Sequence, residues 1–285
     1  MKTKGNKLFS RVASFMLAMV MVLSVFAVVP TEVAAAEKSF KSTGTSSVTL
    51  TDDEVWDVNT NSVAPQYIKF KAKNTGYVTI KMTNASTLDY AYGYLTFCNS
   101  KKKALNSASE KWDTAYDKAA YYTRSFGVKK GQTYYVKIES KYGVKVTATF
   151  KKVTKSNNSS KKKAKTLNAK TTAKGVIIAG DKTADWYKIK VTGNKKVKIS
   201  YTGKTNGDSD YNGIKVSFYD SKGKLYTSNA YDWVSPFTTS GTSKYYRVYS
   251  LSGKQTGVEP GTYYIKVERY NKTSSGYYTL KWSTY

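Results

Sequence analysis

The acidic side chains are the first candidates for chemistry in this sequence, because it contains no histidine. Without an imidazole, a Ser-His-Asp triad, a Cys-His pair, an H-E-x-x-H zinc site and a two-histidine iron site are all excluded. Two carboxylates could still hydrolyse a glycosidic bond. Acidic residues in loops are more often turn formers, however, so we expect no enzymatic activity. The candidate carboxylates form two clusters, Asp52, Asp53, Glu54 and Asp57 in one and Asp208 and Asp210 in the other.

The second acidic cluster also has the composition of a calcium loop. Asn206, Asp208 and Asp210 offer alternating oxygen donors around Gly207, and calcium prefers oxygen ligands. No glutamate follows at the EF-hand spacing, so the alternative is a plain surface turn. These three residues are a candidate calcium site, and we expect no other cofactor.

The formal net charge of +28 indicates either an anionic partner or a strongly solvated surface. Arginine occurs only four times, and the rest of the positive charge is lysine. Because bidentate phosphate recognition usually relies on arginine, we expect diffuse attraction to a glycan or polyanion and no sequence-specific binding of nucleic acid. The alternative is that the lysines only solvate the surface and protect strand edges.

Lysines alternate with apolar residues in two neighbouring segments, residues 185–191 and 196–201. If these segments pair as a hairpin, their lysines lie on one face, where like charges across strands destabilise the sheet and a bound polyanion would relieve the repulsion. The alternatives are that the strands belong to opposite sheets, or that the side chains extend into water. The candidate ligand-binding lysines are Lys188, Lys190, Lys196 and Lys198.

Aromatic residues in polar connecting segments form a second candidate surface for ligand binding. Exposed rings stack on sugar faces at a low entropic cost. The alternative is that these rings fold back and cap a core, because large aromatic side chains are mostly buried. The candidates occupy corresponding places in two halves of the chain and are Trp112, Tyr116, Tyr226, Tyr231 and Trp233.

An internal repeat indicates which elements must position these residues. Residues 66–80 align without a gap to residues 185–199, and further matching blocks follow in the same order. Tyr187, Ile189 and Val191 alternate with polar neighbours, which is the spacing of a strand. The sequence therefore predicts an all-β fold: two tandem jelly-roll-like β-sandwich domains, each of roughly seven or eight strands, after an N-terminal signal peptide.

The domain boundary is expected in the polar, lysine-rich stretch near residues 152–165, which lacks periodicity. We place one module at residues 37–153 and the other at residues 154–285. The only cysteine, Cys98, falls in a predicted strand of the first module and has no partner for an internal disulfide. A buried structural thiol is therefore expected there.

The first 36 residues have the pattern of a secretory signal peptide. A basic start precedes an apolar run from Val12 to Val29, and Ala34-Ala35-Ala36 supplies the small residues of a cleavage site. The alternative is an uncleaved membrane anchor, since the apolar run just reaches the length of a short span. We expect cleavage, an extracellular and in part cell-surface location, and no membrane contact by the mature chain.

Several motifs of the second repeat fit one known family. They are the run Asn157-Asn158-Ser159-Ser160, the strand Asp185-Trp186-Tyr187-Lys188-Ile189, a Gly-x-Tyr-Tyr-Ile-x-Val strand at residues 261–267 and a Gly-x-Tyr-x-Leu strand at residues 276–280. With these motifs, residues 154–285 resemble the bacterial pre-peptidase C-terminal domain. The first module is a more distant relative, with Gln66 where the family prefers aspartate. The resemblance implies a secreted accessory β-sandwich that takes part in binding or secretion.

These patterns predict a secreted, non-catalytic module that attaches to an extracellular or cell-wall glycan or polyanion. Two alternatives stay open. One is a structural or secretion accessory protein without a small ligand, and the other is a carboxylate-dependent hydrolase. Binding that weakens steeply with added salt would favour a polyanion, because bound counterions are then released.

Overall fold

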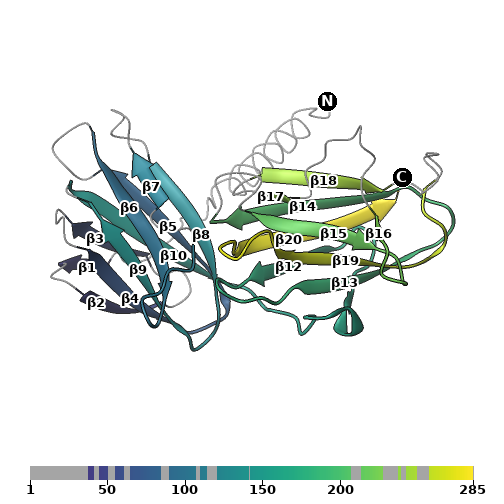
Figure 1. Cartoon of the computed structure of the whole chain (residues 1–285), viewed down its shortest axis with the longest axis horizontal. Helices are drawn as coiled ribbons and strands as arrows, with labels where there is room; N and C mark the ends of the chain where they lie inside the picture. The colour runs from purple at the N-terminus through teal and green to yellow at the C-terminus, as the bar shows by residue number, and fades with distance from the viewer. Residues whose placement is uncertain are drawn as a thin grey trace, which may run out of the picture. The chain divides into compact units, whose positions relative to one another are not determined.

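The computed structural model describes residues 38–41, 45–50, 55–60, 65–84, 90–106, 110–113, 121–140, 142–206, 213–226, 237–238, 242–248 and 257–284. Within these residues the regular structure is β-strand apart from one short 3-10 helix, η1 (Lys161–Lys163), so the all-β prediction is confirmed (Figure 1). The expected signal peptide lies outside the described residues. In the described part of the chain, no helix is long and apolar enough to cross a membrane.

Two five-stranded sheets come from the N-terminal half of the chain, and we name them sheets A and B. Sheet A has the order β1 (Lys38–Lys41), β3 (Val55–Thr60), β10 (Val144–Lys152), β5 (Gly76–Asn84) and β8 (Tyr121–Val128). Sheet B has the order β2 (Thr45–Leu50), β4 (Gln66–Ala72), β9 (Thr133–Glu139), β6 (Tyr92–Asn99) and β7 (Glu110–Asp113).

Two further sheets, C and D, come from the C-terminal half. Sheet C has the order β11 (Lys165–Thr166), β13 (Asp185–Val191), β19 (Gly261–Arg269), β15 (Ile214–Tyr219) and β16 (Leu225–Tyr226), and β17 (Phe237–Thr238) also pairs with β15. Sheet D has the order β12 (Thr172–Ile177), β20 (Gly276–Thr284), β14 (Val197–Thr205) and β18 (Thr242–Val248).

Each pair of sheets encloses its own hydrophobic core, which makes the fold sandwich-like. Strict alternation of buried and more exposed residues in strands such as β4 and β14 sends every second side chain inward. Sheets A and B bury Phe150 and Phe70 in one cluster. Sheets C and D bury Trp282 and Ile265 in another. Burial of these side chains from two opposed layers supplies the main stabilising free energy.

The two sandwiches repeat the same strand arrangement. β4, β9 and β6 are neighbours in sheet B, as β13, β19 and β15 are in sheet C; β10 and β5 pair in sheet A, as β20 and β14 do in sheet D. Ten strands precede residue 153 and ten follow it among the described residues, more than the expected seven or eight per copy. The extra ones include β11, β16 and β17, each too short to show an alternating pattern. The module boundary at residue 153 stays a prediction.

Residues 185–191 and 196–201 do not pair as a hairpin, and the alternative that their strands belong to opposite sheets is confirmed. β13 belongs to sheet C and β14 to sheet D, so the chain crosses from one sheet to the other between them. The same crossing separates β4 from β5 in the first sandwich. The physical reason is that both strands bury alternate side chains in one core, and two opposed layers close that core from both sides.

A small third cluster joins the two sandwiches within residues 37–285, which form one compact unit. It contains Tyr77, Val153, Val176 and Ile178, with Tyr277 packed against it. The rings of Tyr77 and Tyr277 stack with centroids 4.9 Å apart. Beside them, the backbone N–H of Ala179 donates to the carbonyl of Gly127 at 2.9 Å.

Candidate binding surface

Aromatic and lysine side chains alternate across two adjacent strands on the outer side of sheet C. The register of β13 and β19 places Trp186 opposite Lys266, and Lys188 opposite Tyr264. These four side chains are exposed or half-buried, and we name them the second outer face. The Lys266 ammonium lies 5.6 Å from the centroid of the Trp186 ring and 2.7 Å from a carboxylate oxygen of Glu268. Rings and charges are thus interleaved within reach of solvent.

The segment before β11 adds another ammonium to this face. Asn158 holds the segment against β13, because its carbonyl accepts from the Trp186 N–H at 2.8 Å and its amide donates to the Trp186 carbonyl at 3.0 Å. From η1, the Lys161 ammonium reaches the carbonyl of Ser221 at 2.7 Å and lies 4.7 Å from the Tyr264 ring centroid. The Tyr219 ring, from β15, contacts Trp186 with centroids 5.6 Å apart.

Sheet B carries the same pattern in the first sandwich. The register of β4 and β9 places Tyr67 opposite Lys137, and Lys69 opposite Tyr135. These four side chains are half-buried, and we name them the first outer face. The rings of Tyr67 and Tyr135 meet edge to face with centroids 6.2 Å apart. Lys137 pairs with Glu139 at 2.7 Å, and the hydrogen bond to Glu139 raises the pKa of the Lys137 ammonium above its usual value.

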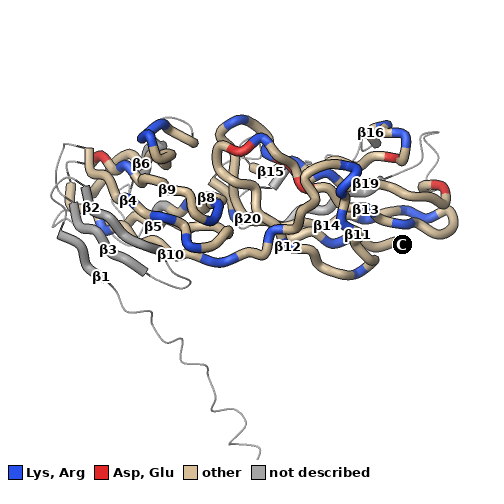
Figure 2. Tube along the Cα trace, turned by 90° about the horizontal axis from the view of Figure 1, so that it is seen from below, with Lys and Arg blue, Asp and Glu red and all other residues tan. Residues whose placement is uncertain are grey.

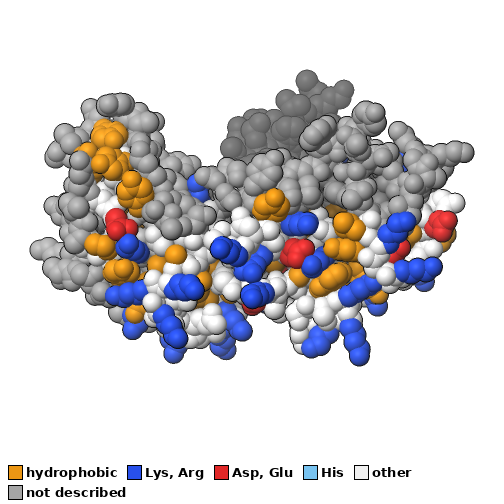
Figure 3. Space-filling model, viewed as in Figure 1, with side chains coloured by type: hydrophobic (Ala, Val, Ile, Leu, Met, Phe, Trp, Pro, Cys, Tyr) orange, Lys and Arg blue, Asp and Glu red, His pale blue; other side chains and the backbone are white. Residues whose placement is uncertain are grey.

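Positive charge gathers on more than these faces. Lysine and arginine positions greatly outnumber acidic ones along the described trace (Figure 2). In the described part of the visible surface, blue basic side chains lie next to orange hydrophobic and aromatic ones (Figure 3). What distinguishes the two outer faces is the repeated pairing of a half-exposed ring with a lysine across each strand boundary. A ring can stack on a sugar, and an ammonium can pair with a carboxylate or phosphate.

The structure separates the four candidate lysines. Lys188 and Lys190 are exposed on the outer side of β13 in sheet C, whereas Lys198 lies on β14 in sheet D and Lys196 just before it. The four therefore do not share one face, because β13 and β14 lie in different sheets. Any role of these residues in binding stays a prediction.

Two of the candidate aromatic residues lie in strands, not in connecting segments. Trp112 falls in β7 and Tyr226 in β16, which occupy corresponding edges of sheets B and C. The sequence predicted that these two aromatic residues occupy corresponding places in the two copies of the repeat. Tyr116, Tyr231 and Trp233 lie outside the described residues, as do the candidate carboxylates Asp52, Asp53 and Glu54.

The candidate calcium ligand Asn206 has a structural role. Its side-chain oxygen accepts from the Ser275 N–H at 2.7 Å, and its amide donates to the Thr273 carbonyl at 2.8 Å, so the buried side chain holds the turn before β20. Asp208 and Asp210 lie outside the described residues. Among the residues that are described, no three acidic or cysteine side chains cluster as a metal site would require.

A buried polar network lies at the start of β13, where the sequence has its Asp-Trp-Tyr motif. The Asp185 carboxylate accepts from the Tyr278 hydroxyl and from the Lys155 ammonium, each at 2.8 Å. The Tyr278 hydroxyl also lies 2.8 Å from that of Tyr187. Burial raises the pKa of Tyr187 to about 12 and that of Tyr278 well above its usual value. Both phenols therefore stay neutral, and the network anchors the strand without offering a nucleophile.

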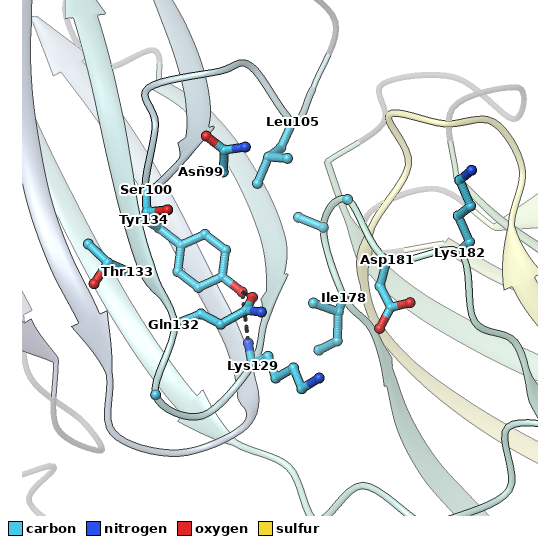
Figure 4. Close-up of a pocket in the computed structure, with 13 residues that line it drawn as sticks. Asn99, Ser100, Leu105, Lys129, Gln132, Thr133, Tyr134, Ile178, Asp181 and Lys182 are labelled. Atoms are coloured by element: carbon cyan, nitrogen blue, oxygen red, sulfur yellow. Dashed lines mark hydrogen bonds between the residues drawn. The ribbon is translucent and has the colours of Figure 1, made fainter.

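An open cavity of about 830 Å³ has partly polar walls. Figure 4 shows the Tyr134 hydroxyl bonded to Gln132 and to the backbone of Lys129. Because this hydroxyl already donates to Gln132 and accepts from Lys129, it has little capacity left for a ligand. Burial raises its pKa to about 12, so it also remains neutral. Facing residues in the same view are Ile178, Asp181 and Lys182.

Sequence reasoning missed most of the aromatic members of the outer faces. Tyr67, Tyr135, Trp186 and Tyr264 all fall in blocks of the internal repeat, where they served only to align the two copies. The signal was present, because each ring sits one position from a core residue and is thus directed outward. Lys161 gives no such signal, since it reaches sheet C from a helix outside the repeated blocks.

The fold and the outer faces together describe a sandwich-like all-β protein with a repeated surface pattern. Residues 183–269 match the family model of the bacterial pre-peptidase C-terminal domain. The match confirms the predicted resemblance, and the segment spans β13 to β19 with the whole second outer face. No curated protein matches this chain in sequence.

Solved structures give weaker similarities. The pre-peptidase C-terminal domain of collagenase from Bacillus anthracis is 21% identical, covers 42% of this chain and 94% of its own, and has a TM-score of 0.29. Tripeptidyl peptidase 2 is 12% identical over 84% of this chain and 24% of its own, also with a TM-score of 0.29. The CBM22 tandem domain of Paenibacillus barcinonensis Xyn10C is 10% identical over 75% of this chain and 79% of its own, with a TM-score of 0.22. The resemblance of residues 183–269 to this family therefore rests on the family model.

Proposed function

We propose that this chain is a non-catalytic binding module that attaches to an extracellular or cell-wall glycan or polyanion. The observation that carries the proposal is the second outer face, where Trp186 and Tyr264 alternate with Lys266 and Lys188 across paired strands. Half-exposed rings offer stacking area for sugar faces, and the exposed Lys188 ammonium attracts negative substituents, whereas Lys266 is paired with Glu268. The net charge of +28 adds a general attraction for polyanions.

The family match supports the non-catalytic part of this proposal, because the pre-peptidase C-terminal domain that residues 183–269 match is a non-catalytic domain. The sequence has no histidine, so the second outer face holds no nucleophile activated by an imidazole base. An extracellular location fits the signal-peptide pattern of the first 36 residues. The predominance of lysine over arginine argues for diffuse recognition of a polymer and against a base-reading surface.

Co-sedimentation with purified bacterial cell walls tests the proposal. We expect the wild-type protein to bind and to lose most of its binding between about 50 and 200 mM salt. A matched pair of double variants distinguishes the contribution of the outer face to binding from that of the net charge. Lys188→Ser with Lys190→Ser removes two exposed lysines of sheet C, and Lys174→Ser with Lys281→Ser removes two exposed lysines of sheet D.

The first double variant should weaken binding several-fold more than the second. Equal losses would leave only non-specific charge attraction and contradict a role for the outer face. Absence of any binding, with no release of wall fragments, would favour the structural or secretion accessory protein. Release of soluble sugar fragments by the wild-type protein would favour the carboxylate-dependent hydrolase.

A further inference from the structure

One turn has the same backbone in both sandwiches but a different residue at its strained position. After β6, the Asn99 N–H donates to the Lys103 carbonyl at 2.9 Å, and the Lys103 N–H donates to the Asn99 side chain at 3.0 Å. After β15, Asp220 and Lys224 make the same two bonds at 3.0 and 2.8 Å. The turns therefore correspond residue by residue. Their fourth positions are Lys102 and Gly223.

Both residues adopt a left-handed backbone, with φ of 58° at Lys102 and 91° at Gly223. Glycine adopts this conformation without strain, whereas a residue with a side chain does so at a cost. Lys102 is nevertheless placed so that its ammonium lies 4.1 Å from the Tyr67 ring centroid and 5.5 Å from that of Tyr135. The first outer face thus gains an ammonium from a position where glycine would be the easier choice.

The second outer face acquires an equivalent ammonium by another route. Gly223 has no side chain, and the Lys161 ammonium lies 3.7 Å from the point where a Cβ of residue 223 would stand. The same ammonium is 4.7 Å from the ring of Tyr264, the counterpart of Tyr135. Two chain positions that do not correspond in the repeat, Lys102 and Lys161, thus bring a positive charge near corresponding rings, at 5.5 Å from Tyr135 and 4.7 Å from Tyr264. Duplication of one module explains the corresponding rings. It does not explain why ammonium groups from two unrelated chain positions lie beside them.

Stability alone does not account for the position of Lys102, because an exposed cation–π contact contributes little and the backbone there is strained. The Lys161 ammonium also has a structural role, since it donates to the carbonyls of Asp220 and Ser221. A ligand does account for the position of Lys102. A sugar stacked on the ring would bring its carboxylate or phosphate to the ammonium beside it. Two faces with corresponding rings, lysines and an added ammonium suit a ligand that presents the same group repeatedly.

We propose that the first and second outer faces are equivalent binding sites for repeating units of an acidic polysaccharide, with Lys102 and Lys161 contacting its anionic groups. This inference rests on the proposed function and extends it in two respects. It assigns a site to the first sandwich, which lies outside the matched family segment. It also names an acidic sugar polymer, in preference to a neutral glycan or a polyanion without sugar rings.

Isothermal titration calorimetry with a short oligogalacturonate tests the inference on the full mature chain, with a neutral oligosaccharide and linear polyphosphate as comparison ligands. We expect two oligogalacturonate molecules per chain and much weaker binding of both comparison ligands. Lys102→Gly restores the glycine of the second turn and should therefore fold normally. It should weaken one of the two sites about tenfold, the usual effect of losing one charge-assisted hydrogen bond.

Lys161→Ser should weaken the other site by a similar factor, and the Lys174→Ser, Lys281→Ser control should change neither. A single site per chain, lost in Lys161→Ser and unchanged in Lys102→Gly, would overturn the inference and leave the proposed function intact. Two sites whose affinities neither substitution changes would also overturn it. Equal affinity for polyphosphate and oligogalacturonate would do the same. If the protein bound neither oligogalacturonate nor cell walls, the proposed function would be overturned too.

Discussion

At the scale of single residues, the same strand position serves different purposes in the two sandwiches. Tyr219 is half-exposed and contacts Trp186 on the second outer face. Its counterpart in the repeat, Cys98, is only 1% exposed. The prediction of a buried thiol is confirmed. Residue 98 therefore adds to the packing of the first sandwich, whereas residue 219 adds to the surface of the second.

The buried thiol predicts how stability depends on pH. Burial raises the pKa of Cys98 from 9.0 to about 11, so the folded protein keeps this proton where the unfolded chain has lost it. Its contribution to stability is complete below pH 9 and is lost as the pH rises towards 11. We expect the free energy of unfolding, measured in urea, to fall over this range, and to fall less steeply in Cys98→Ala. Because lysine titration is common to both proteins, parallel curves would refute the assignment.

At the scale of elements, the sequence predicts the strands better than their partners. Residues 66–72 and 185–191 form strands as expected, because alternation of apolar and polar residues determines which side chains are buried. Alternation does not determine which strand lies alongside, so it left open whether β13 and β14 pair as a hairpin or lie in different sheets, as they do. The ring-and-lysine pattern depends on pairing with β9 and β19, which lie far away in sequence.

The start of β13 carries a network that the first sandwich does not share, since Gln66 replaces Asp185 there. Asp185→Ala removes the acceptor of both Tyr278 and Lys155, and it leaves a buried hydroxyl with fewer partners. We expect a loss of about 2–4 kcal/mol in the free energy of unfolding, measured by urea denaturation.

Asp181→Ala is the matched control. Its half-exposed carboxylate accepts only from the Thr183 N–H among the hydrogen bonds described, so about 1 kcal/mol or less is expected. Equal losses would show that Asp185 has no special role.

At the scale of the whole molecule, the two sandwiches are linked where β8 meets the segment after β12. Gly127 forms a parallel bridge with Ile178, and a Cβ on this glycine would stand 2.0 Å from the Ile177 carbonyl oxygen. The close approach of two backbones explains why a glycine occupies this strand position. Nothing in the sequence indicated the link, because it joins residues from different copies of the repeat.

Gly127→Ala tests whether this link contributes to stability. The added methyl group must displace backbone, so we expect a loss of about 1–3 kcal/mol and a melting temperature lower by several degrees, measured by calorimetry. Gly261→Ala is the control, since a Cβ there meets only the Tyr263 ring at 3.6 Å. A Gly127→Ala protein as stable as the control would show that the two backbones separate at no cost.

The most direct test of the account is an NMR titration of the isotope-labelled protein with oligogalacturonate. We expect the largest shift changes on the two outer faces, at the Trp186 indole and the backbone of Lys188 and Tyr264, and at Tyr67 and Tyr135. Signals from Lys174 and Lys281 on sheet D should stay in place. Changes centred on sheet D or on the cavity beside Tyr134, with the outer faces unaltered, would contradict it.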